Sequence, residues 1–247
     1  MIQLQHLSVS FGGRRILDDL STTVPAGSVT AVMGPNGCGK TTLLRCLGGL
    51  LEPDEGQVLI NSRPVASYPA RALAQQVAMV RQHPQTDFEF TAFETVLMGR
   101  NPYQRHLQNE SHEDWAIVEQ CMRQTNTWHL RFSRPSQMSG GELQRVMIAR
   151  ALAQQTPVLL LDEPVSNLDI AHQIDIMRLL RSATGKTILI VIHDLNLALR
   201  YCDRLLLLKE GHLLFDGPIA EGLTPDNVAS VYGVHCSLAD GRIVYDY

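Results

Sequence analysis

Several stretches of the chain are continuously apolar and rich in β-branched residues, a pattern typical of strands covered on both faces of a sheet. Each is bounded by polar, proline or glycine residues, which favours short strands over helices. We therefore predict a central sheet buried inside an α/β domain. The stretches are residues 28–33, 77–80, 157–161 and 187–192.

The two ends of this core show different strand patterns. Residues 2–11 alternate between apolar and polar positions, as expected of an exposed edge strand, and residues 16–24 predict a second strand of an antiparallel sheet. Residues 57–60 predict a short strand that ends at a turn. Residues 205–208 and 213–215 are expected to pair as a closing hairpin.

Helical spacing dominates elsewhere. Leucines at 43, 44, 47 and 51 recur on one helical face, residues 70–74 are helical in pattern, and residues 87–155 lack any long apolar strand. We predict an α/β core with an antiparallel β subdomain in residues 1–86 and 156–217. A helical subdomain in residues 87–155 is inserted into it, and residues 218–247 form a C-terminal tail with a short helix near 224–232.

Length and composition limit the class of protein. The chain has 247 residues, enough for one large α/β domain or for a core with an inserted subdomain. With 45% hydrophobic and 19% charged residues, its composition is that of an ordinary globular protein. The formal net charge of −4 gives no overall attraction to nucleic acid. Net charge alone does not exclude local basic patches. The five cysteines form no C-x-x-C pair, which favours reduced thiols in the cytosol.

The sequence begins directly in strand-like residues, so we expect no signal peptide. No apolar run approaches the roughly 20 residues needed to cross a bilayer. If the protein works at a membrane, another chain is expected to span it.

The strand at 28–33 runs into a glycine-rich loop and then into a helix, the context required by the phosphate-binding pattern G-x-x-x-x-G-K-[ST]. Backbone N–H groups of such a loop turn inward around an anion, and the helix points its positive end there. Lys40 is expected to reach the β- and γ-phosphates, and the Thr41 hydroxyl to ligate Mg²⁺. The pattern predicts a nucleoside triphosphate site. Its expected contacts are Gly34, Pro35, Asn36, Gly37, Cys38, Gly39, Lys40, Thr41 and Thr42.

Two acids, Asp162 and Glu163, end the apolar run at 157–161. A carboxylate at the carboxyl end of a central strand beside a phosphate loop is where Mg²⁺ is held, and the second can polarise an attacking water. Gln82 and His193 follow two other buried strands, at the edge where parallel sheets carry ligand-facing loops. Taken singly, Gln82 fits a solvated loop better than a ligand site.

Two further features are weak on their own. Ser139, Gly140 and Gly141 precede a helix and form a second potential phosphate cradle. Phe11 ends the first strand, where its ring can stack on a base or belong to the core.

Taken together, these pieces resemble the ATPase subunit of ABC transporters over essentially the whole chain. The motifs are Walker A at 34–41, the Q-loop glutamine Gln82, the signature at 138–142, Walker B at 158–162 followed by Glu163, the D-loop at 166–169, and the switch histidine His193. The resemblance implies the ABC ATPase fold, a P-loop NTPase (RecA-like) core with the two subdomains described above. Phe11 falls where the family often has a base-stacking tyrosine.

The signature departs from the usual family pattern, because Met138 and Glu142 replace the more frequent leucine and glutamine. Glu142 is expected to add negative charge near a phosphate. Three less specific stretches, at 35–40, 98–103 and 193–198, look most like importers of ferric siderophores, haem or cobalamin.

The resemblance also implies a mechanism shared between two subunits. Walker A of one copy and Ser139, Gly140, Gly141 and Glu142 of a second copy would sandwich ATP, with Asp169 of the D-loop at the same interface. Asp162, Thr41 and Gln82 would surround Mg²⁺, Glu163 would polarise water, and His193 would sense the γ-phosphate.

The expected partners are a second copy, transmembrane permease subunits and, indirectly, a substrate-binding protein, at the cytoplasmic face of the plasma membrane and without nucleic acid. Residues Phe88, Phe90, Phe93, Val96 and Leu97 are a candidate docking surface, although each can equally be a core residue. Two alternatives stay open, an importer for another solute and a soluble ABC ATPase. A P-loop kinase would explain neither Ser139–Gly141 nor His193.

Overall fold

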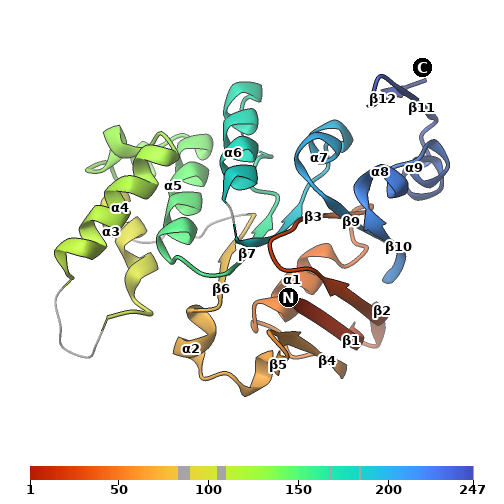
Figure 1. The fold of residues 1–247 in the computed structure, drawn as a ribbon, viewed down its shortest axis with the longest axis horizontal. Coiled ribbons are helices and arrows are strands. Elements are labelled where there is room, and N and C mark those ends of the chain that lie inside the picture. Colours follow the sequence, from red (N-terminus) through yellow and green to blue (C-terminus); the bar gives the residue numbers. More distant parts are fainter. Residues whose placement is uncertain (83–89, 105–109, 167, 184, 247) are drawn as a thin grey trace.

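The computed structural model describes residues 1–82, 90–104, 110–166, 168–183 and 185–246. Figure 1 shows a central sheet with helices at one end, a smaller antiparallel sheet below it, and the C-terminal elements at the other end. The elements follow the predicted order along the chain.

The central sheet has six strands in the order β10-β9-β3-β8-β7-β6. All neighbours from β9 to β6 are parallel, and β10 pairs antiparallel with β9. Every residue of β3, β7 and β8 is buried. The strands are β3 (Val29–Met33), β6 (Val77–Val80), β7 (Val158–Asp162), β8 (Thr187–Val191), β9 (Arg204–Lys209) and β10 (His212–Pro218).

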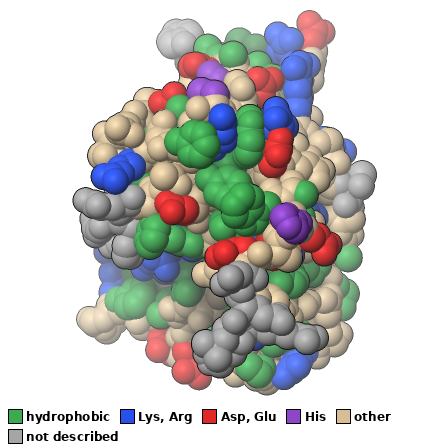
Figure 2. Space-filling view, turned by 90° about the vertical axis from the view of Figure 1, so that its left-hand side faces the viewer, with side chains coloured by type: hydrophobic (Ala, Val, Ile, Leu, Met, Phe, Trp, Pro, Cys, Tyr) green, Lys and Arg blue, Asp and Glu red, His purple; other side chains and the backbone are tan. Residues whose placement is uncertain are grey.

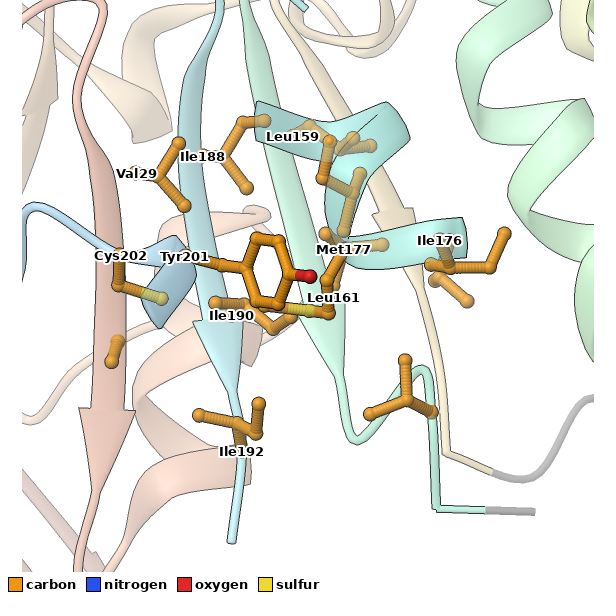
Figure 3. Packing of buried hydrophobic residues seen from close by; sticks show 14 of the residues in the cluster. Val29, Leu159, Leu161, Ile176, Met177, Ile188, Ile190, Ile192, Tyr201 and Cys202 are labelled. Carbon is orange, nitrogen blue, oxygen red and sulfur yellow. The ribbon is translucent and has the colours of Figure 1, made fainter. Parts of the chain in front are cut away.

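These strands are continuously apolar because both faces of the sheet are covered. Alternate side chains enter two different hydrophobic clusters, for example Leu159 and Leu161 in one and Val158 and Leu160 in the other. Figure 3 shows the first cluster, in which Ile188 and Ile190 of β8 pack with Leu159 and Leu161 of β7 beneath the covering helices.

The second sheet is antiparallel with the order β2-β1-β4-β5. The prediction that residues 2–11 form an exposed edge strand is wrong, because β1 lies between β2 and β4 and pairs with both. Its apolar side chains Ile2, Leu4 and Leu7 are buried against α1, which lies between the two sheets. The strands are β1 (Ile2–Phe11), β2 (Arg14–Val24), β4 (Glu55–Ile60) and β5 (Arg63–Pro64).

The helices of the core flank the central sheet. The predicted helices after the phosphate-loop motif and at 70–74 are confirmed. The core helices are α1 (Lys40–Leu47), the 3₁₀ turn η1 (Val65–Ser67), α2 (Ala70–Ala74), α6 (Ile170–Ser182) and α7 (Leu195–Tyr201).

Between β6 and β7 the described residues form helices and turns, as the sequence pattern predicts. Both tryptophans pack there, with the Phe93 ring centroid 5.3 Å from that of Trp115 and 6.3 Å from that of Trp128. The elements are α3 (Ala92–Leu97), η2 (Met98–Arg100), α4 (His112–Gln124), η3 (Trp128–Leu130), η4 (Pro135–Gln137) and α5 (Gly140–Ala153).

The C-terminal tail is part of the main core. Val228, Val231 and Ile243 are buried in the cluster that covers the central sheet. A terminal hairpin, which the sequence pattern did not indicate, pairs β11 with β12. The tail contains α8 (Ile219–Gly222), α9 (Pro225–Tyr232), β11 (Cys236–Ala239) and β12 (Arg242–Tyr245).

Among the described residues, no helix combines the length and the apolar character needed to span a membrane.

Candidate functional site

The loop from β3 to α1 takes a path that only glycine allows at two positions. Gly34 has φ 146°, and a Cβ there would lie 2.2 Å from the Leu208 carbonyl oxygen. Gly39 has φ 104°, and a Cβ there would lie 2.4 Å from a Leu17 methyl carbon. Both contacts are far inside van der Waals distance, so the glycines at the two ends of the motif fix the shape of the loop.

Lys40 begins α1 and curls back into this loop. Its side chain is buried, and Nζ donates hydrogen bonds to the carbonyl oxygens of Gly34 (2.8 Å) and Pro35 (2.9 Å). The charged ammonium is therefore held at the centre of the loop, at the positive end of the helix.

A cleft of about 720 Å³ opens beside the loop. It brings together residues from the antiparallel sheet, from α1 and from four loops that are far apart in the sequence. Of the predicted loop contacts, Gly34, Pro35 and Cys38 do not line it, and Cys38 is buried in the core below. The lining residues are Phe11, Ile16, Asn36, Gly37, Gly39, Lys40, Thr41, Thr42, Gln82, Glu163 and His193.

Asp162 lies at the end of β7 and is 3% exposed. Burial raises the pKa of its carboxyl group, the nearby Thr41 hydroxyl opposes the rise, and the charge of Glu163 adds to it. Its Oδ1 atom is buried without a hydrogen-bond partner among the described residues. A buried carboxylate oxygen without a donor, beside a hydroxyl, fits a hard cation such as Mg²⁺.

Glu163 is the meeting point of three strand ends. Its Oε2 accepts a hydrogen bond from Gln82 Nε2 at 2.7 Å, and its Oε1 lies 2.8 Å from His193 Nε2. The Glu163 backbone has φ 50°, a left-handed conformation that is uncommon for this residue type. These contacts bring together three residues that the sequence places after buried strands.

Gln82 was expected near the metal site. In the structure its amide group donates to Glu163, and no hydrogen bond from it to Asp162 is found among the described residues. A role of Gln82 as a metal ligand stays a prediction.

Phe11 is 50% exposed and lines the cleft opposite the loop. The alternative that Phe11 is a core residue is therefore wrong. A flat aromatic surface at the mouth of the cleft is available for stacking.

The signature residues lie elsewhere, at the start of α5, and do not line the cleft. Ser139 caps this helix by accepting a hydrogen bond from the Glu142 amide, while Glu142 Oε2 accepts from the Ser139 amide and hydroxyl, each at 2.8 Å. These reciprocal bonds form a capping box and lower the pKa of Glu142. The acid that replaces glutamine thus has a structural task in capping the helix, in addition to its predicted charge effect.

Asp169 is also outside the cleft. It caps α6 by accepting from the His172 amide at 2.9 Å, and its Oδ1 lies 2.8 Å from His172 Nδ1. Within one copy of the chain, Ser139–Glu142 and Asp169 are therefore not brought to the cleft.

The candidate docking surface after Gln82 needs correction. Val96 is fully buried, Phe93 and Leu97 pack against the core, and Phe88 lies outside the described residues. Only Phe90 is a large exposed hydrophobic among the described members, at 41%. Figure 2 views this end of the molecule and shows hydrophobic side chains gathered near the middle of the face.

A second groove of about 820 Å³ lies where α1 ends, between β4, α2 and β6. Its walls are mostly apolar and include Leu51, Val65, Leu73 and Met79. The sequence pattern did not indicate this groove, because its walls come from several separate strands, helices and loops.

Sequence reasoning also missed Tyr232. Its hydroxyl oxygen accepts a hydrogen bond from the Gly34 amide at 3.0 Å, so the C-terminal tail reaches the glycine loop. A single tyrosine at the end of a short amphipathic helix carries no pattern that could have indicated this contact.

The site contains a glycine loop around a buried lysine, together with a buried acid and an adjacent glutamate. Comparison with known protein families agrees with this arrangement. The profile of the family described as ABC transporter matches residues 17–166. The chain belongs to the ABC transporter family. Domains of this family bind ATP, and the ATP-binding subunits of its importers are ATPases. This chain is an ATPase of the ABC type.

Two relatives within the ABC transporter family match almost the whole chain. The hemin import ATP-binding protein HmuV of Bordetella avium is 42% identical over 247 residues, which cover 96% of this chain and 94% of HmuV. The probable siderophore transport system ATP-binding protein YusV of Bacillus subtilis is 39% identical over 240 residues, which cover 96% of this chain and 87% of YusV.

The fold is also that of solved ABC structures. The ATP-binding cassette MJ0796, a dimer bound to ADP and Pi in a post-hydrolysis state, superposes with a TM-score of 0.80 at 29% identity, covering 89% of this chain and 99% of MJ0796. The predicted ABC ATPase fold is confirmed.

Proposed function

We propose that this chain is the ATPase subunit that powers import of a ferric siderophore or a related haem or cobalamin chelate. The observation that carries the ATPase part is Glu163, held between Gln82 and His193 at the edge of the cleft that contains Lys40. The names of HmuV and YusV support the chelate. The chain would act at the cytoplasmic face of the membrane, bound to a permease.

ATP would lie in the 720 Å³ cleft with its base against Phe11 and its phosphates in the glycine loop. Lys40 and the loop amides of Asn36, Gly37 and Gly39 would neutralise the phosphate charge. Thr41 and Asp162 would hold Mg²⁺, whose contribution when bound is to offset charge on the β- and γ-phosphate oxygens. The unpartnered Asp162 Oδ1 supports this assignment.

Hydrolysis requires a positioned water in line with the γ-phosphate. Glu163 would accept a hydrogen bond from that water with one carboxylate oxygen. Its other contacts already fix the position of the side chain. His193 and Gln82 each hold one of its oxygens, and this arrangement orients the base before ATP arrives.

A second copy of the chain would complete the site. Ser139–Gly141 and Asp169 lie outside the cleft of their own chain, on the exposed N-termini of α5 and α6. A head-to-tail arrangement of two copies would place these residues over the partner's cleft, and the dimeric MJ0796, which has this fold, supports such pairing.

The permease would dock in the 820 Å³ groove between β4, α2 and β6. Met79 lines this groove and belongs to β6, the strand that leads directly to Gln82. A partner in the groove would thus touch the strand that carries one of the contacts of Glu163.

The test is to purify the chain from native membranes, identify the permease that accompanies it, and reconstitute the complex in liposomes. Transport of a ferric siderophore, haem and cobalamin is then measured with ATP inside or outside. We expect uptake of one of these chelates, lost in Lys40→Ala and retained in Lys186→Ala, a second partly buried lysine that donates to a carbonyl away from the cleft.

If the only partners recovered are soluble proteins or nucleic acid, the transport function is wrong. If a permease is recovered but the complex moves only another solute, the chelate assignment is wrong and the ATPase assignment stands.

A further inference from the structure

The C-terminal tail contacts the phosphate loop at one defined point. The backbone amide of Gly34, the first residue of the loop, donates a hydrogen bond of 3.0 Å to the hydroxyl of Tyr232, the last residue of α9. The two residues are 198 positions apart in the sequence, so this bond joins the C-terminal tail to the start of the nucleotide site.

The Gly34 peptide has little freedom to find another partner. The residue is buried, and its surroundings leave no space even for a Cβ, because the Leu208 carbonyl and the Cys38 sulfur lie too close. Its carbonyl oxygen accepts the bond from Lys40 Nζ. Gly34 is therefore held on its amide side by the tail and on its carbonyl side by the phosphate-binding lysine.

The tyrosine is itself firmly placed. Its ring packs against the main core, and Lys209 Nζ donates to the carbonyl of Ser230 in the same helix at 2.9 Å. Beyond α9, the terminal hairpin is tied to α7 by two bonds, from Ile243 N to Asn196 Oδ1 and from Asn196 Nδ2 to the Ile243 carbonyl. The tail is thus tied to the main core and to α7.

We propose that Tyr232 is a positioning residue for the phosphate loop, whose hydroxyl holds the Gly34 peptide so that Lys40 and the loop amides are aligned before ATP binds. This inference rests on the proposed ATP site and assigns part of its affinity to the tail. Tyr232 is not among the residues that line the cleft, and it acts through Gly34 and Lys40.

Tyr232→Phe removes one oxygen atom and keeps the packed ring. The buried Gly34 amide then lacks a partner, and an unpaired buried donor is unfavourable enough to shift the loop. We expect the KM and Kd for ATP to rise about three- to tenfold, the effect of one neutral hydrogen bond. Because Glu163, His193 and Gln82 are untouched, kcat should stay within about twofold.

The matched control is Tyr201→Phe. Tyr201 lies in α7, is buried in the same cluster, and its hydroxyl forms no hydrogen bond with the described residues. Tyr201→Phe loses the same atom without touching the loop, from a residue that is more deeply buried than Tyr232. Its KM for ATP should equal that of the wild type. If Tyr232→Phe leaves KM unchanged, or if both variants raise it equally, the proposal is wrong, whatever happens to the melting temperature.

Hydrogen exchange of the wild-type protein gives an independent readout. In the nucleotide-free chain, NMR should show the Gly34 amide exchanging much more slowly than that of Gly37, which is exposed at the cleft. Equal exchange rates would also contradict the proposal. A wild-type chain that neither binds nor hydrolyses ATP would instead contradict the proposed function, so the two failures are distinguishable.

Discussion

Glu163 combines a strained backbone with a fully specified side chain. A non-glycine residue at φ 50° is unfavourable by roughly 1–2 kcal/mol, and the hydrogen bond from its amide to the Val191 carbonyl at 3.2 Å helps to hold it. The turn directs the carboxylate away from the end of β7 and toward Gln82 and His193. Strain at this position is consistent with a residue selected for its direction.

Asp162, its neighbour, gives a prediction that separates stability from activity. The carboxylate is buried, and one of its oxygens has no hydrogen-bond partner among the described residues. Burial raises its pKa, so its negative charge is unfavourable without a cation. Asp162→Asn should raise the stability of the nucleotide-free protein by about 1 kcal/mol, or about 2–4 °C in Tm. The same change should abolish Mg²⁺-dependent hydrolysis.

Thermal unfolding followed by circular dichroism, with and without Mg²⁺ and ATP, checks this prediction. The control is Asp175→Asn, on an exposed carboxylate in α6. A lower Tm for Asp162→Asn in the absence of ligands would show that the buried charge is already compensated within the chain.

At the scale of single elements, the N-terminus of α5 explains the unusual signature. A capping box accepts either glutamate or glutamine at its third helical position, because both side chains can reach back to the capping residue. Glu142→Gln should therefore keep the stability and ATPase rate, within about 0.5 kcal/mol and twofold. Glu142→Ala should lose about 0.5–2 kcal/mol, as capping substitutions typically do.

Urea unfolding and steady-state ATP hydrolysis are measured on the two variants. These measurements distinguish a capping role of Glu142 from an effect of its negative charge on turnover. If the charge of Glu142 governs turnover, Glu142→Gln and Glu142→Ala will change the rate alike, and the capping explanation for the residue is insufficient.

The helical elements are joined by a buried ion pair. Arg100 in η2 donates from Nε to Asp114 Oδ1 of α4 at 2.8 Å, and from an Nη atom to the Ala153 carbonyl of α5, also at 2.8 Å. Arg100→Ala should lower stability by about 3–5 kcal/mol, because it leaves Asp114 buried without its cation. Exposed Arg178→Ala, in a 3.9 Å surface pair, should change stability by less than about 1 kcal/mol.

The same pair predicts a pH dependence. Burial tends to raise the pKa of Asp114, but hydrogen bonds from Arg100 and Ser111 outweigh it and lower the pKa. The stabilisation is therefore present above the unfolded pKa of Asp and is lost as pH falls through the lower, folded value. Urea midpoints should decline on acidification below about pH 4 in the wild type and less steeply in Asp114→Asn. Parallel curves would remove this role of Asp114.

For the whole molecule, the features that could be predicted from the sequence are those set by local patterns and by the geometry of a parallel sheet. The glycine loop lies between a buried strand and a helix, and Gln82, Glu163 and His193 meet because the carboxyl ends of parallel strands share one edge. The position of β1 could not be predicted, since its interior place depends on pairing with β4, more than forty residues downstream. Tyr232 was missed for the same reason, because its contact with Gly34 is entirely non-local.

The arrangement of the whole site predicts an ATP-dependent dimer. One chain presents Lys40 and Glu163 in its cleft and Ser139 on a separate exposed helix end, so a shared site requires two copies. Glu163→Gln keeps the shape of the side chain and removes the general base, which is typically worth about 10²–10⁴ in rate. Hydrolysis should therefore slow by about that factor, with little loss of ATP binding. ATP should then trap this variant as a dimer in size-exclusion chromatography with light scattering.

Adding Ser139→Arg should keep it monomeric by crowding the partner's phosphate site, whereas adding exposed Ser182→Arg, at the far end of α6, should not. A Glu163→Gln chain that binds ATP yet stays monomeric at high concentration, both alone and in complex with its permease, would contradict the shared site.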